Sequence, residues 1–123
     1  MPTPPAEILT KLDAAKNIWV ASVRPDGRPH LVPVWFAWHT DKIYICIDPT
    51  SVKARNFAND NRVALALEDG SSPLICEGEV FIMDKPWPGE IVRIFKEKYD
   101  WEVTTDSQYT QLVGITPKKW LHW

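Results

Sequence analysis

The sequence has no apolar stretch near the ~20 residues that a membrane-spanning helix requires. It contains only two cysteines, Cys46 and Cys76, which lie in separate apolar runs without a Cys-x-x-Cys spacing. The three histidines, His30, His39 and His122, are scattered along the chain. These shortages argue against a disulfide framework and against a metal site, and the two cysteines are expected to be small core residues.

The sequence also lacks a large excess of positive or negative residues, because 14 basic and 16 acidic residues leave a net charge of −2. This balance gives no support for a nucleic-acid partner or an anionic-membrane partner. The opening residues, Met-Pro-Thr-Pro-Pro-Ala-Glu, lack the basic and apolar parts of a signal peptide, so a cytoplasmic location is expected. The length of the chain predicts one domain spanning residues 1–123.

Tryptophan, by contrast, is abundant, with seven residues in 123. A single small core cannot enclose so many indole rings, so some are expected to line a ligand site or a subunit interface. Trp35 is the main candidate for a ring platform in a ligand site, and a core or interface role is the alternative.

The apolar pattern predicts a mainly β protein with peripheral helices. Six short strands joined mostly by hairpin-length turns predict a six-stranded antiparallel barrel, because a doubly wound parallel fold needs a helix after nearly every strand. Pro33 cannot donate to a strand ladder, so the second strand is expected to be an edge, a bulge or a bend. The expected strands are 18–23, 29–39, 43–48, 61–68, 74–83 and 112–120, and the expected helices are 3–15, 50–59 and 88–99.

The junction between the third strand and the second helix suggests a binding site. An apolar strand ends at Asp48, and the first turn of the following helix contains Thr50, Ser51 and Lys53. Free N–H groups at a helix N-terminus, two hydroxyls and an ammonium together could hold a phosphate group. The alternative is an ordinary junction in which Thr50 caps the helix and Lys53 is solvated.

Four segments follow one another in a distinctive order: Arg-Pro-Asp-Gly-Arg-Pro, His-Leu-Val-Pro-Val-Trp-Phe, Ile-Tyr-Ile-Cys-Ile-Asp-Pro-Thr-Ser-Val-Lys-Ala-Arg-Asn-Phe and Asn-Arg-Val-Ala-Leu. In this order and spacing the chain resembles the pyridoxamine 5′-phosphate oxidase-like split-barrel flavoproteins. The resemblance implies a six-stranded split β-barrel that pairs into a homodimer. It also implies a flavin-type cofactor in a groove at each end of the dimer interface.

Carried over position by position, the resemblance implies a cofactor site drawn from four parts of the fold. The second strand would follow the isoalloxazine edge through its backbone, and the end of the third strand would line the ribityl chain. The second helix would hold the phosphate, and the last strand of the partner subunit would bring a tryptophan to the ring. In that order the residues are Pro33, Val34 and Trp35; Ile47 and Asp48; Ser51, Val52, Lys53 and Asn56; and Trp123, or failing it Trp120.

The sequence departs from that family in two respects. Val52 stands where relatives often have a basic residue, so Arg24, Arg28 or Arg55 would have to supply the missing charge. The chain is also far shorter than true pyridoxamine phosphate oxidases and lacks their C-terminal arginine and histidine motif. Oxidation of vitamin B6 is therefore not expected.

The leading hypothesis is an oxidoreductase that binds flavin mononucleotide (FMN) and transfers hydride or electrons between the flavin and a small acceptor. A deazaflavin-dependent reductase is a close alternative, because both cofactors share their phosphate end. A further alternative is a non-catalytic module that binds a flavin or haem. No catalytic residue is assigned, although His30 is a candidate acid or base.

Overall fold

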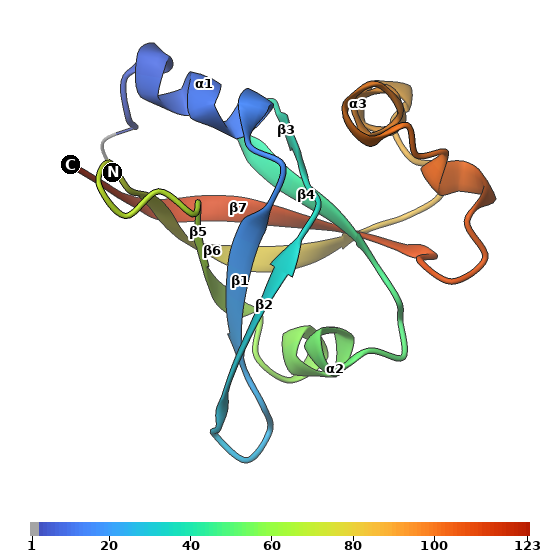
Figure 1. The fold of residues 1–123 in the computed structure, drawn as a ribbon. Coiled ribbons are helices and arrows are strands. Elements are labelled where there is room, and N and C mark those ends of the chain that lie inside the picture. The colour runs from blue at the N-terminus through green and yellow to red at the C-terminus, as the bar shows by residue number, and fades with distance from the viewer. Residues whose placement is uncertain (1–2) are drawn as a thin grey trace.

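A computed structural model describes residues 3–123, which form seven strands, three helices and one 3₁₀ turn (Figure 1). The expectation of a mainly β protein with peripheral helices is confirmed, whereas the expected count of six strands is one too few. In chain order the elements are α1 (Ala6–Ala14), β1 (Ile18–Val23), β2 (Pro29–Val34), β3 (Ala37–His39), β4 (Lys42–Ile47), α2 (Val52–Asn59), β5 (Arg62–Ala66), β6 (Leu74–Met83), α3 (Gly89–Tyr99), the 3₁₀ turn η1 (Val103–Thr105) and β7 (Gln111–His122).

The additional strand arises because the stretch 29–39 is divided. The strands form one antiparallel, curled sheet in the order β2-β1-β5-β6-β7-β4-β3 (Figure 1). β2 pairs with β1 at one edge of this sheet, and β3 pairs with β4 at the other. Trp35 and Phe36 belong to neither strand, so the chain itself joins the two edges. One continuous ladder is impossible here, because the two halves of the stretch have different partners.

Two apolar clusters hold the sheet and helices together. Alternate residues of β4 face opposite sides, so Ile45 lies in the larger cluster with parts of α1 and α2, and Tyr44 lies in the smaller cluster with α3. Both cysteines are buried, as expected for core residues, and burial raises the pKa of the Cys46 and Cys76 thiols to about 12. Because β4 is covered on both faces, it provides a firm base for the elements around its end.

The second helix begins at Val52, and its N-cap is Ser51, whose Oγ accepts a hydrogen bond from the backbone N–H of Ala54 at 3.3 Å. Thr50 instead donates its hydroxyl proton to Asp48 at 2.7 Å, so the alternative of a Thr50 cap is wrong. In Figure 1, α2 lies at the lower side of the sheet and α3 at its upper right. Each helix within residues 3–123 is too short or too polar to span a bilayer.

Candidate functional site

A cavity of about 340 Å³ lies where β2 ends, next to β4, α2 and the segment that follows α3. The structure thereby gathers four of the predicted cofactor-binding residues from distant parts of the chain. They are Pro33, Val34, Trp35 and Lys53, and the remaining lining residues are Cys46, Trp101 and Tyr109. We call Trp35, Trp101 and Tyr109 the aromatic lining of this cavity.

Trp35 presents a half-exposed ring to the cavity. The residue is 47% exposed, and its indole stacks on Tyr99 with ring centroids 4.6 Å apart and planes within 7°. Trp101 meets the same indole edge to face, with centroids 5.7 Å apart. Trp35 is therefore fixed by two aromatic neighbours while much of its surface stays open, which is the arrangement that a flat ligand ring can use.

Trp101 and Tyr109 were not predicted as site residues. Their rings meet at 90° with centroids 5.7 Å apart. Both come from residues 100–110, a connection that contains only the short turn η1 and has no helical or strand periodicity. The surplus of tryptophan in the sequence was the one signal that pointed toward such a lining.

Lys53 brings a cation into the cavity. Burial lowers the pKa of its ammonium, and the nearby Asp48 carboxylate partly opposes this effect. Within residues 3–123, no carboxylate lies within 4.0 Å of its Nζ to form an ion pair. A half-buried ammonium without an ion pair can bind an anionic group of a ligand.

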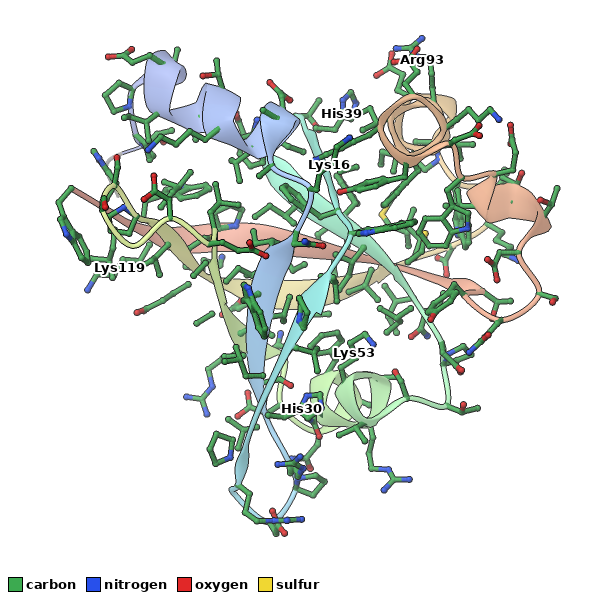
Figure 2. The ribbon with its side chains drawn as sticks, viewed as in Figure 1. Lys16, His30, His39, Lys53, Arg93 and Lys119 are labelled. Carbon is green, nitrogen blue, oxygen red and sulfur yellow. The ribbon has the colours of Figure 1, made fainter. Side chains whose placement is uncertain are left out.

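Further positive charge comes from the β1–β2 hairpin. Figure 2 shows His30 and Lys53 in the space between β2 and α2. The His30 Nδ1 atom is buried and has no hydrogen-bond partner among the described residues. Burial lowers the pKa of His30, and the charges of Arg24 and Lys53 lower it further. Arg24 is held beside β2 by its bond to the Pro29 carbonyl at 2.6 Å, whereas Arg28 is paired with an aspartate of the turn.

The predicted phosphate-binding residues line two cavities of the chain. Ser51 and Arg55 line a second cavity, of about 610 Å³, between α2 and strands β6 and β7, and Lys53 lines the first. Arg55 therefore does not replace, beside Lys53, the charge that is missing at Val52. None of the three arginines considered from the sequence lines the first cavity beside Lys53.

Two predicted residues at the end of β4 have different surroundings. Ile47 is fully buried, and its side chain belongs to the larger apolar cluster. Asp48 accepts hydrogen bonds from the Thr50 hydroxyl and the Thr50 backbone N–H, which hold the pKa of this carboxyl below its usual range. Its second oxygen accepts a long bond, at 3.4 Å, from the Gln108 side chain.

The other predicted residues are spread between core and surface. Asn56 is fully buried, its Nδ2 donates to Ser22 at 3.0 Å, and its Oδ1 has no partner among the described residues. Val52 is exposed on α2, and Trp123 is 74% exposed beyond the end of β7. Whether these residues contact a cofactor stays a prediction.

The groups around the first cavity fit an anion that is attached to a flat ring. The ammonium of Lys53 can donate to phosphate oxygens, and the aromatic lining can enclose a ring system. His30 is not one of the lining residues, but it lies close enough to Lys53 for that charge to lower its pKa, and its buried Nδ1 has no partner among the described residues. The described residues contain no group of three or more His, Cys, Asp or Glu side chains placed to hold a metal ion.

Comparisons with known proteins identify the family. The model of the pyridoxamine 5′-phosphate oxidase family matches residues 4–123. Similar solved structures include the heme storage protein HutZ from Vibrio cholerae, with TM-score 0.79 and 14% identity over 98% of this chain and 95% of that one. The conserved hypothetical protein Rv2991 from Mycobacterium tuberculosis has TM-score 0.78 and 25% identity, covering 100% and 86%. An F420 reductase has TM-score 0.74 and 25% identity, covering 97% and 98%.

No curated protein matches the chain by sequence. The family match nevertheless extends over all seven strands and all three helices of the structure. Two of the similar structures also share a quarter of their residues with this chain over almost its whole length. The chain therefore belongs to the pyridoxamine 5′-phosphate oxidase family.

Proposed function

We propose that the chain is an oxidoreductase that binds a flavin-type cofactor, FMN in the first instance, in the cavity of Trp35 and Lys53. One observation carries this proposal. A single cavity of about 340 Å³ combines an aromatic lining with a half-buried ammonium that has no ion pair among residues 3–123. A flavin nucleotide joins a flat, conjugated ring to a phosphate, so it matches both features.

The bound cofactor would supply the hydride chemistry. Lys53 and His30 would hold its phosphate by charge and hydrogen bonding. The backbone of Pro33 and Val34 would follow the ring edge, and the aromatic lining would exclude water and keep the ring in one orientation. No side chain has to act as a nucleophile in this scheme.

A second copy of the chain would complete the site, as the family resemblance implies. Trp123 is 74% exposed and Ile82 is 60% exposed, but they lie at opposite ends of the β6–β7 pair and do not form one patch, so the resemblance alone supports the interface. Sedimentation of the pure protein should therefore give the mass of a dimer. A monomer at micromolar concentration would contradict this part of the proposal.

A deazaflavin-dependent reductase is the second candidate. The chain is 25% identical to an F420 reductase, and the match covers 97% of this chain and 98% of that one. Flavin and deazaflavin coenzymes both carry a phosphate on the side chain of the ring system, so Lys53 could meet either. Absorbance separates them, because a deazaflavin absorbs at shorter wavelength than FMN.

The test is an absorbance and fluorescence titration of the purified protein with FMN, with the deazaflavin coenzyme and with haemin. We expect one of the first two to bind, and we expect turnover with a reduced nicotinamide and a panel of quinone and dye acceptors. Binding without turnover on that panel would leave a cofactor-binding module. A haem spectrum with no binding of either flavin would overturn the proposal.

A further inference from the structure

The break between β2 and β3 leaves backbone groups that the sheet does not pair. Phe36 lies in this break and is fully buried. Buried N–H and C=O groups without a partner are costly, so this residue needs partners outside the ladder. Tyr99, the last residue of α3, supplies them. Its hydroxyl accepts the Phe36 N–H at 3.0 Å and lies 3.1 Å from the Phe36 carbonyl, to which it can donate.

The same end of α3 also reaches α1 and the connection between α1 and β1. The Tyr99 hydroxyl lies 2.9 Å from the Lys16 carbonyl, which is the alternative acceptor for its proton. The ammonium of Lys98 donates to the Phe36 carbonyl at 3.3 Å and to the Leu12 carbonyl at 3.2 Å, and it lies 3.8 Å from the centre of the Phe36 ring. The end of α3 therefore holds the break on two sides.

The ring of Tyr99 makes a separate contact with Trp35, the residue before Phe36. It stacks in parallel on the indole of Trp35 at 4.6 Å. Phe95, one turn earlier on α3, packs against Tyr99 from behind, with centroids 6.2 Å apart. One residue thus determines both where the backbone turns at Phe36 and how the indole of Trp35 is inclined.

We propose that Tyr99 is a positioning residue for the cofactor ring, acting through Trp35. Tyr99 does not line the cavity itself, whereas Trp35 does. Its hydroxyl fixes the backbone at the break, and its ring fixes the plane of the indole that faces the ligand. This inference rests on the proposed function, because it concerns the ring that the cavity would hold.

Two variants of Tyr99 separate its two contacts. Tyr99→Phe keeps the stack on Trp35 and removes the hydroxyl, whereas Tyr99→Leu removes both. Tyr44→Leu is the matched control, because Tyr44 belongs to the same apolar cluster as Tyr99's neighbour Phe95, is buried and does not line the cavity. Each variant is titrated as the full chain with FMN and with the deazaflavin coenzyme.

We expect Tyr99→Leu to weaken binding of the preferred cofactor by about tenfold. Tyr99→Phe should weaken binding of the same cofactor by only about threefold, because the stack on Trp35 remains. The decisive measurement is a double-variant comparison, since in a Trp35→Leu background the change Tyr99→Leu should cost little more. An undiminished effect in that background, or an equal effect of Tyr44→Leu, would overturn the proposal.

A readout in the free protein keeps this inference separate from the proposed function. The stacked pair should give a near-ultraviolet circular dichroism band that Trp35→Leu and Tyr99→Leu each remove, and that Tyr44→Leu retains. If the wild-type protein binds neither cofactor but shows this behaviour, the proposed function fails and the orienting contact stands. A band that persists in Tyr99→Leu contradicts the orienting contact directly.

Discussion

The indole N–H of Trp101 donates a hydrogen bond to the Asp106 carboxylate at 3.0 Å. The other oxygen of that carboxylate accepts the backbone N–H groups of Gln108 and Tyr109, each at 2.8 Å. These bonds, with those to the backbone first, hold the pKa of Asp106 below its usual range. One carboxylate therefore fixes two of the three residues of the aromatic lining.

Substitution of Asp106 should loosen this lining in two steps. Asp106→Asn keeps an oxygen for the backbone N–H groups but turns an amide N–H₂ toward the Trp101 N–H, so it should lose about threefold in cofactor affinity. Asp106→Ala removes every acceptor and should lose about tenfold. Titration with the cofactor checks both, and Asp69→Ala is the control, because Asp69 accepts the backbone N–H groups of Ser71 and Ser72 in the same way but does not line the cavity. Equal affinities for all three variants would contradict the role given to Asp106.

Lys53 and Arg55 provide a matched pair of cations on α2. We expect Lys53→Met to weaken FMN binding by ten- to a hundredfold, because a charge-assisted contact contributes roughly 1.5–3 kcal/mol. Arg55→Met should leave FMN affinity nearly unchanged, because Arg55 lines the other cavity. Riboflavin, which has no phosphate, should bind the Lys53 variant as it binds the wild type. If Arg55→Met weakened FMN binding more than Lys53→Met does, the phosphate would have to bind in the second cavity instead.

The pH dependence of binding should report His30. Its pKa in the free protein lies below the ordinary value of 6.5, because of burial and then the Arg24 and Lys53 charges. A bound phosphate favours the protonated imidazole, so protonation and binding support each other and this contribution to affinity grows as the pH falls below 6.5. The phosphate itself gains a proton near pH 6, which acts in the opposite direction.

The comparison with His30→Gln isolates the imidazole. The ratio of wild-type to variant affinity for FMN should rise as the pH is lowered from 7.5 to 5.5, a window of about one unit on each side of the ordinary histidine value. For riboflavin the ratio should stay flat. A flat ratio for FMN as well would place His30 outside the phosphate site.

Gly78 should tolerate no side chain. It lies on β6 at the register shift opposite β7, and a Cβ at this position would be 2.6 Å from the Thr116 backbone oxygen. Gly78→Ala should therefore lower the free energy of unfolding by about 1–3 kcal/mol, as overpacking does elsewhere. Gly70→Ala, with nothing within 4 Å of the new Cβ, is the control in chemical denaturation. Equal stability of the two variants would mean that β6 and β7 adjust to the new Cβ without any loss in the free energy of unfolding.

Local sequence signals identified most of the elements and one of the two edges. Pro33 marked its stretch as an edge or a bend, and it lies in β2, which is an edge strand. The division after Val34 could not be read, because it depends on β3 pairing with β4 rather than with β1. The β3–β4 pairing is itself a tight local hairpin, with Thr40 and Asp41 at positive φ in its turn, but the unbroken apolar run over residues 31–38 does not mark where one strand ends and the next begins.

Only part of the candidate site could be predicted from local sequence signals. Residues 33–35 and residues of α2 were expected at one ligand, and four of them share a cavity. Ser51 and Lys53 were expected to act together, yet they line different cavities. Ser51 is the N-cap of α2, with extended backbone and its hydroxyl engaged by the Ala54 N–H, whereas Lys53 lies inside the helix, so closeness in sequence does not direct their side chains to one place.

The two prolines of β2 have a consequence for the behaviour of the protein in concentrated solution. A sheet edge with free N–H groups invites another chain to add a strand and so to begin aggregation. Pro29 and Pro33 remove two of those donors from β2, where a continuous row would otherwise be open to a foreign strand. The edge strand β2 therefore stays open to a small ligand but is a poor template for the addition of further strands.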